Sequence, residues 1–248
     1  MGASLVAVGG VYLAKSGKLQ AIGDKFVKKE IGDAGIPEDN SNPINTIADR
    51  ITTVSKERDI ITFDKDYLDM DDAEKKELVK TINSENGTYN CAACTAAYDL
   101  FRKTGKVFQI RANVDTAGFG RKEFMDKLYK DFTKFDSIKE SKSCAEFSNK
   151  LLEKVGSKEN VWGRVCLTGA DGSSGHAISF YTQNGKLRLI DSQNKIDVSP
   201  EHFDLLLGSK FDWSSVEFAR TDNLEFNDNG IEWLGRMAQR TKKKQEET

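Results

Sequence analysis

The chain has 248 residues, of which 37 are basic and 39 acidic, giving a net charge of -2. These charges are dispersed and nearly balanced, so the composition gives no electrostatic reason to expect a nucleic-acid or membrane partner. Four cysteines are too few for a disulfide-built fold of this length, which indicates folding in a reducing compartment. The length allows one substantial domain with extensions at its ends.

Residues 1–60 mix glycine, aspartate, asparagine and lysine around short apolar patches. This composition predicts an N-terminal extension or arm. The apolar stretch 3–14 has no basic residue before it, contains two adjacent glycines and is too short to cross a bilayer. We therefore expect neither a conventional signal peptide nor a membrane anchor in this segment.

The compact domain is predicted over residues 61–225, followed by a C-terminal helix and polar tail over 226–248. Helical patterns precede most of the strand-like ones, and no regular alternation of the two occurs. The expected helices are 69–83, 90–105, 122–132 and 144–156, and the expected strands are 107–112, 160–167, 176–182, 186–191 and 215–220. This segregation predicts an α+β fold in which N-terminal helices pack on an antiparallel sheet.

The dipeptide Asn184-Gly185 lies between two alternating apolar runs, which predicts a hairpin with a two-residue turn. In that register Ile178 lies opposite Asp191, and His176 lies opposite Gln193. All four side chains then project from one face, with Asp191 a diagonal neighbour of His176 at roughly 7–8 Å. A carboxylate at that position can orient an imidazole ring and stabilise its protonated form.

The chain has only two histidines, so the choice of an imidazole base is narrow. His176 follows the flexible run GADGSSG and opens a strand, whereas His202 is expected in the first turn of a surface helix. We therefore predict His176 as the base. The alternative is that His176 and Asp191 are ordinary residues at the ends of hairpin strands.

The predicted helix 90–105 begins at a cysteine, with Asn90 as its N-cap and Gly105 at its end. A cysteine in this position gains thiolate character from the helix dipole and the free N–H groups. Cys91 is therefore the predicted nucleophile, and Cys94 is a buried packing residue or a resolving thiol. A zinc site and a regulatory Cys91–Cys94 disulfide are the alternatives for this pair.

Three short motifs resemble the papain-fold toxin family, which includes phage- and mobile-element-encoded members and effectors that deamidate glutamine in a host protein. They are N-C-A-A-C at residues 90–94, G-H at 175–176 and L-I-D-S-Q at 189–193. The resemblance covers roughly residues 85–195. It departs from the family at Ser192, where relatives often carry proline or glycine.

The resemblance implies a papain-like cysteine-enzyme fold and a triad of Cys91, His176 and Asp191, with Asn90, Gln193 and Cys94 as supporting residues. Backbone N–H groups at the helix start, together with Asn90, are expected to form an oxyanion hole. It further implies glutamine deamidation of a protein substrate. A cysteine protease or an acyl transferase would use the same acyl-enzyme, and a structural phage or mobile-element protein with a vestigial site is a further alternative.

The expected partner is a protein presenting a glutamine or peptide amide, and an immunity protein or a phage structural protein is a second kind of partner that the resemblance suggests. We expect no cofactor and no metal, and no nucleic-acid or membrane partner. The resemblance places such a protein in the bacterial cytoplasm, in a phage particle, or in a target cell after delivery by a dedicated system.

Overall fold

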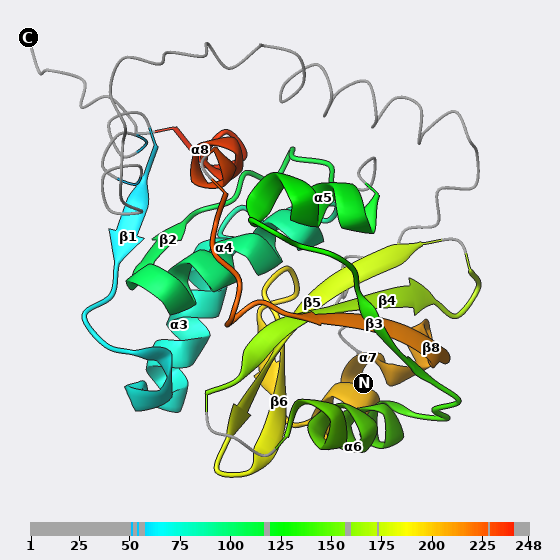
Figure 1. The fold of residues 1–248 in the computed structure, drawn as a ribbon. Helices are drawn as coiled ribbons and strands as arrows, with labels where there is room; N and C mark the ends of the chain where they lie inside the picture. Colours follow the sequence, from blue (N-terminus) through cyan, green and yellow to red (C-terminus); the bar gives the residue numbers. More distant parts are fainter. Residues whose placement is uncertain are drawn as a thin grey trace, which may run out of the picture.

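The computed structural model describes residues 51, 54, 58–116, 120–156, 160–172, 174–227 and 229–240. Residues 1–50 and 241–248, which include nearly all of the predicted N-terminal arm and the end of the predicted tail, lie outside the described residues. Helices and antiparallel strands make up the described part, so the predicted α+β class is confirmed (Figure 1).

The helices are η1 Tyr67–Asp69, α3 Asp72–Ile82, α4 Cys91–Thr104, α5 Arg121–Leu128, α6 Cys144–Val155, α7 Pro200–Leu207, η2 Gly208–Lys210 and α8 Gly230–Gly235. The strands are β1 Ile60–Thr62, β2 Lys106–Phe108, β3 Asp136–Lys139, β4 Trp162–Gly169, β5 Gly175–Gln183, β6 Lys186–Asp191, β7 Ile196–Val198 and β8 Phe211–Arg220. Six of these strands form one antiparallel sheet in the order β3-β8-β4-β5-β6-β7.

The predicted β5–β6 hairpin forms with the predicted turn. Asn184 and Gly185 both adopt positive φ, 53° and 68°, as a two-residue turn of this type requires. The pairing begins at Gln183 with Lys186 and continues to Ser179 with Ile190, as predicted. The ladder ends there, so the predicted pairs Ile178–Asp191 and His176–Gln193 do not form, and Asp191 instead pairs on its other side with Ile196 of β7.

Helices cover both faces of the large sheet (Figure 1). Side chains from α3, α4, α5 and α8 pack with Tyr181, Ile190 and Ala219 on one face. Side chains from α6 and α7 pack with Ile178, Phe180 and their neighbours on the other. The alternation of β5 between these two cores follows from the two-residue period of a strand, and it places α4 directly against β5.

Local signals account for the ends of the first two long helices. Asp71 and Glu74 form a reciprocal capping box at the start of α3, which satisfies the backbone N–H groups of Asp71, Ala73 and Glu74. Gly105 ends α4 in the left-handed conformation, with φ of 69°, and its N–H donates to the carbonyl of Phe101. Both helices were predicted close to these boundaries.

One predicted strand is shorter and lies elsewhere. The apolar pattern over 107–112 predicted a longer strand, but β2 covers only Lys106–Phe108 and pairs with β1 in a separate two-stranded sheet. Beyond it, Ile110 makes an isolated bridge to Ala238 near the C-terminus. The apolar side chains of this segment are therefore buried by the helical core and α8 rather than by the large sheet.

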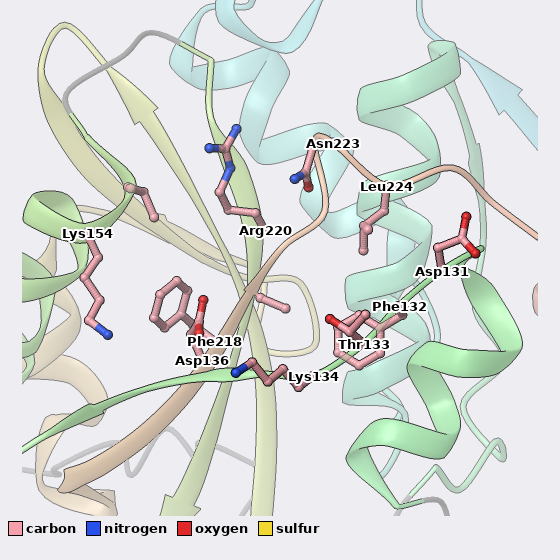
Figure 2. Close-up of a pocket in the computed structure, with 12 residues that line it drawn as sticks. Asp131, Phe132, Thr133, Lys134, Asp136, Lys154, Phe218, Arg220, Asn223 and Leu224 are labelled. Carbon is pink, nitrogen blue, oxygen red and sulfur yellow. The ribbon is translucent and has the colours of Figure 1, made fainter.

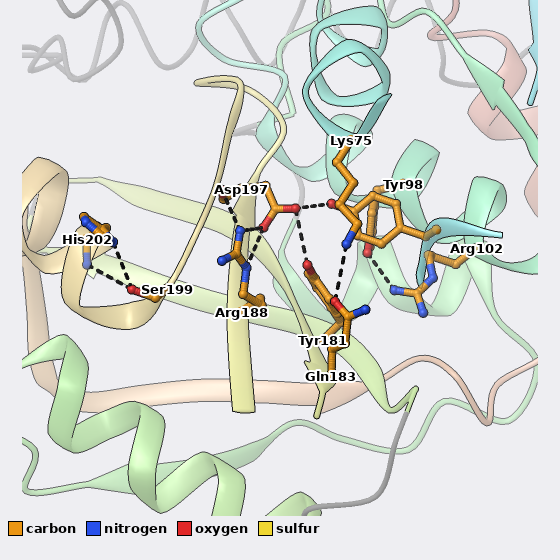
Figure 3. Close-up of polar contacts among 10 residues, drawn as sticks. Lys75, Tyr98, Arg102, Tyr181, Gln183, Arg188, Asp197, Ser199 and His202 are labelled. Atoms are coloured by element: carbon orange, nitrogen blue, oxygen red, sulfur yellow. Dashed lines mark hydrogen bonds and ion pairs between the residues drawn. The ribbon is translucent and has the colours of Figure 1, made fainter. Parts of the chain in front are cut away.

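A polar cluster joins α3 and η1 to the strands β5, β6 and β7 (Figure 3). The hydroxyl of Tyr67 donates to Asp197, which also accepts hydrogen bonds from Arg188 at 3.1 and 3.2 Å. Lys75 donates to the side-chain oxygen of Gln183 at 3.3 Å. These contacts fix α3 and η1 against β5, β6 and β7.

The described C-terminal residues pack into the same helical core. Ile231, Leu234 and Met237 have no exposed surface, and α8 lies against α4 and α5. Within the described residues, none of the helices combines the length and apolarity needed to span a bilayer.

Candidate active site

Cys91 is the first residue of α4, as the sequence predicted. The N–H of Cys94 donates to the carbonyl of Asn90 at 2.9 Å, which closes the first helical turn. The N–H groups of residues 91–93 belong to the first turn, where α-helix geometry provides no intrahelical acceptor. A sulfur at this position lies beside the positive end of the helix dipole, which favours the thiolate.

The side chain of Asn90 does not cap this helix, which corrects the sequence prediction. Asn90 occupies the N-cap position, but its side-chain amide donates to Oδ1 of Asn83 at 3.0 Å and to the carbonyl of Arg111 at 3.2 Å. Both Nδ2 hydrogens are therefore engaged, so Asn90 has no donor for an oxyanion. Because its oxygen also leaves the helix uncapped, the first-turn N–H groups stay available to an anion.

His176 and Asp191 form a direct pair. Nε2 of His176 lies 2.6 Å from Oδ2 of Asp191, with the histidine side chain 11% exposed and the aspartate fully buried. His176 also makes a side-chain hydrogen bond with Cys91. Since Nε2 is engaged by the carboxylate, Nδ1 is the ring nitrogen left for the sulfur. The three residues predicted as a triad are thus brought together.

Asn194 completes the environment of Asp191 and was not found from the sequence. Its backbone N–H donates to Oδ1 of Asp191 at 3.0 Å, and its side-chain amide donates to Oδ2 at 2.7 Å. Short polar residues often close turns in this way, so the run Asp191 to Asn194 carried a recognisable turn signal. Three donors on one buried carboxylate hold it ionised and fixed in orientation.

The pKa shifts agree with this geometry. Burial alone raises the pKa of the Cys91 thiol, but the hydrogen bond and positive charge of His176 outweigh burial and lower it. Burial lowers the pKa of the His176 imidazolium, but the charge and hydrogen bond of Asp191 and the contact with Cys91 raise it to about 10. For Asp191, burial is opposed by His176 and Asn194, and the net pKa is lowered.

Together these shifts favour a charged site at neutral pH. A thiol with a lowered pKa loses its proton, and an imidazole with a raised pKa takes it. The result is a thiolate–imidazolium pair backed by a carboxylate, which is the activated form of a cysteine nucleophile.

Phe211 packs flat against the histidine ring. The ring centroids are 5.6 Å apart and the planes differ by 6°. Phe211 opens β8 and also stacks on Phe203 of α7. Nothing in the local sequence links residues 176 and 211, so this contact could not be predicted without the strand order. It holds the imidazole from the face of the ring, while Asp191 holds it from the edge.

Two buried polar side chains anchor the start of α4 to the sheet. Thr95 donates to the carbonyl of Cys91 at 2.7 Å and lies 3.3 Å from the carbonyl of Ala177, the residue after His176. Arg164 of β4 donates to the carbonyl of Ala92 at 3.0 Å. These bonds fix the nucleophile helix relative to the strands that position its histidine.

The remaining cysteines are poor nucleophiles. Cys94 is fully buried, and burial raises its pKa well above the ordinary value. Burial also raises the pKa of Cys144 to about 12 and that of Cys166 to about 11. All four thiols are free, and within the described ranges no cluster of three or more histidine, cysteine or acidic side chains could hold a metal ion.

Gln193 does not lie across the hairpin from His176. The chain leaves β6 after Asp191 and makes a turn over residues 192–195, so the predicted pairing does not form. The backbone carbonyl of Gln193 instead accepts a hydrogen bond from Asn83 at 2.8 Å, and its side-chain oxygen is buried without a hydrogen-bond partner among the described residues. Ser192, where the sequence departs from the papain-fold toxin motif, lies in this turn.

A cavity of about 380 Å³ lies elsewhere (Figure 2). Its walls come from the α5–β3 connection, the end of α6 and the last residues of β8. Those residues of β8 pair with the start of β4, whereas His176 pairs with Leu167 near its end. The cavity is therefore at the opposite end of the sheet and contains none of the predicted site residues.

Fold and site together define an α+β protein with a cysteine at a helix start, paired to a histidine and a buried aspartate. No family model matches the chain, and no curated protein matches it. Among solved structures it is similar to two variants of the Salmonella effector SpvD. The glycine variant has 13% identity and a TM-score of 0.43 over 78% of this chain and 96% of that chain. The arginine variant has 15% identity and a TM-score of 0.38 over 73% and 94%.

Proposed function

We propose that this chain is a papain-like cysteine amidohydrolase that deamidates glutamine in a protein substrate. The observation that carries the proposal is the hydrogen-bonded series from Cys91 at the start of α4 to His176 and on to Asp191, at 2.6 Å in its second step. The resemblance of the motifs at residues 90–94, 175–176 and 189–193 favours the glutamine carboxamide over a peptide bond as the target.

In the first half-reaction, the Cys91 thiolate attacks the carboxamide carbon and forms a tetrahedral intermediate. Its oxyanion is stabilised by first-turn N–H groups of α4, which the side chain of Asn90 leaves uncapped. The His176 imidazolium gives its proton to the amide nitrogen as the carbon–nitrogen bond breaks. Ammonia leaves, and a thioester to Cys91 remains.

In the second half-reaction, the now neutral His176 takes a proton from water, and the hydroxide adds to the thioester carbon. Collapse of this intermediate releases the carboxylic acid, and the sulfur leaves as a thiolate beside the regenerated imidazolium. The sum is one carboxamide and one water giving one carboxylic acid and one ammonia. Asp191 stays ionised throughout and keeps Nδ1 of the ring directed at the sulfur.

The test is to incubate the full chain with a pool of glutamine-containing peptides and folded proteins. We expect ammonia release together with the mass change of an amide to an acid, mapped to glutamine and absent with Cys91→Ala. New peptide termini without ammonia would instead identify a protease, and transfer to an added amine would identify an acyl transferase. No turnover with any substrate, and no difference between wild type and Cys91→Ala, would support a structural protein with a vestigial site.

A further inference from the structure

Asn83, the C-cap residue of α3, is fully buried and uses the whole hydrogen-bonding capacity of its carboxamide. Its amide nitrogen donates to the carbonyl of Gly87 at 3.0 Å and to that of Gln193 at 2.8 Å. Its oxygen accepts from the N–H of Gly87 at 2.9 Å and from the side chain of Asn90 at 3.0 Å. A primary amide has two donor hydrogens and two acceptor lone pairs, and all four are engaged.

Two of the three partner residues belong to the segment that leads into the nucleophile. Gly87 is four residues before Cys91, and Asn90 is the residue directly before it. This segment is tightly packed, because a Cβ on Gly87 would lie 2.3 Å from Nδ2 of Asn90 and 2.8 Å from the Cα of Ala112. Asn83 therefore fixes the path by which the chain enters α4.

The third partner belongs to the other half of the site. Gln193 lies in the turn that follows Asp191, and Asp191 itself accepts the backbone N–H of Asn194 in that turn. A single buried side chain thus connects the approach to Cys91 with the turn that holds the carboxylate of the His176–Asp191 pair. Asn83 and Gln193 are 110 residues apart in sequence.

We propose that Asn83 is a positioning residue that sets the alignment of Cys91 with the His176–Asp191 pair. This inference rests on the proposed function, since it concerns the same site. Asn83 does not touch a reacting atom and acts through the two segments that it joins. Misplacement by about 1 Å can cost on the order of 100-fold in rate in a site of this kind, so the fixed spacing of these segments matters to the chemistry.

A merely structural role predicts a different signature. Removing any buried, fully bonded carboxamide leaves orphaned partners and lowers stability. Only a positioning role predicts that the thiolate–imidazolium pair is also weakened in the protein that stays folded. The pH dependence of Cys91 alkylation separates the two, because the thiolate is the reactive form and the readout needs no knowledge of the substrate.

The experiment measures the rate of iodoacetamide alkylation at Cys91 across a pH series, by peptide mass spectrometry on the full chain. The variants are Asn83→Ala, Asn83→Ser, His176→Ala and the matched control Thr221→Val. Thr221 is also fully buried, and its hydroxyl donates to Asp99 at 2.8 Å, away from the triad. Circular dichroism and thermal melts establish which variants are folded.

We expect a wild-type midpoint below the ordinary thiol pKa of about 8.5. Asn83→Ala should move the midpoint upward, toward that of His176→Ala, and lower the alkylation rate at neutral pH about tenfold for each unit by which the midpoint rises above the assay pH. Thr221→Val should melt at a lower temperature and keep the wild-type midpoint. If Asn83→Ala does not fold, Asn83→Ser is judged by the same criterion, with a smaller shift expected because its hydroxyl retains part of the network.

A folded Asn83 variant with the wild-type midpoint would overturn the positioning role and leave the proposed function intact. A wild-type midpoint at the ordinary value, equal to that of His176→Ala, would overturn both, because Cys91 would then carry no activated thiolate to align. An equal shift in Thr221→Val would show that the midpoint reports general loosening, and the inference would be wrong.

Discussion

Nε2 of His176 lies 2.6 Å from Oδ2 of Asp191, and the same carboxylate accepts hydrogen bonds from the backbone and side-chain nitrogens of Asn194. This distance is typical of a charge-assisted hydrogen bond. It assigns one ring nitrogen to the carboxylate and leaves the other for Cys91. The chemistry proposed for this chain depends on that division of the imidazole between two partners.

Replacing Asp191 with asparagine should narrow the pH range of activity from the alkaline side. The active form needs a thiolate, so the rate falls in acid as Cys91 is protonated at its lowered pKa. It also needs an imidazolium, so the rate falls in alkali as His176 loses its proton at about pH 10. The charge of Asp191 is a principal cause of that raised pKa. Asp191→Asn should therefore move the alkaline limb to lower pH and reduce kcat/KM by about 100-fold or more.

The matched control for this prediction is Asp197→Asn. Asp197 is also a poorly exposed aspartate in a salt bridge, but its carboxylate accepts hydrogen bonds from Arg188 and Tyr67 and makes none with His176 (Figure 3). This variant should lose stability and keep the wild-type pH profile. A shift of the alkaline limb with Asp197→Asn and none with Asp191→Asn would contradict the assignment of the carboxylate.

The two cysteines of the N-C-A-A-C motif should separate cleanly by mutation. Cys91→Ala should abolish turnover and leave the melting temperature almost unchanged, because the part-buried residue Cys91 belongs to neither hydrophobic core. Cys94→Ala should keep turnover and lower the free energy of unfolding by about 1 kcal/mol, since it empties part of a fully buried site. Chemical denaturation and an ammonia assay on both variants measure the two effects. Loss of turnover in Cys94→Ala alone would reverse the assignment.

Phe211→Leu should weaken the hold on the histidine ring without removing any charge. A stacked aromatic ring stabilises a nearby cation by about 0.5–1 kcal/mol. Without it, the alkaline limb of the pH–activity profile should move to lower pH by a fraction of a pH unit. Phe203→Leu is the control, because Phe203 stacks on Phe211 in the same core. It should cost comparable stability while leaving the pH profile in place. Identical profiles for wild type and Phe211→Leu would mean that the ring contact does not act on His176.

The turn of the β5–β6 hairpin offers a test of the fold that is independent of the site. Gly185 has a φ of 68°, a backbone conformation that residues other than glycine adopt at a cost of roughly 1–2 kcal/mol. Gly185→Ala should lower the free energy of unfolding by about that amount. Gly120→Ala is the control, since Gly120 has φ of -59° and a Cβ there comes no closer than 3.9 Å to a neighbour. Equal stabilities of the two variants would argue against this turn.

Local signals explain what could be predicted. The Asn184-Gly185 turn fixed the register of β5 and β6, and Gly105 and the acidic start of α3 marked helix ends. The conjunction of Cys91, His176 and Asp191 followed from a helix start and a hairpin together with the three motifs. Each of these features depends on residues close in sequence, where turn chemistry and capping dominate.

What could not be predicted depends on distant partners. Asparagine is a preferred N-cap residue, but the side-chain amide of Asn90 instead donates hydrogen bonds to Asn83 and Arg111, which are distant in sequence from the helix start or outside the helix. The stacking of Phe211 on His176 requires the strand order of the sheet. Gln193 was expected to continue the strand β6, whereas the hydrogen bond between Asp191 and Asn194 closes a turn that takes the chain away from β6.

The most direct test of the central claim is covalent labelling with a peptide whose glutamine carboxamide is replaced by a chloroketone. Intact-mass measurement and peptide mapping count the adducts and locate them. We predict a single adduct on Cys91 in the wild type, slower labelling in His176→Ala and none in Cys91→Ala. Equal labelling of wild type and Cys91→Ala, or an adduct on another cysteine, would contradict the account.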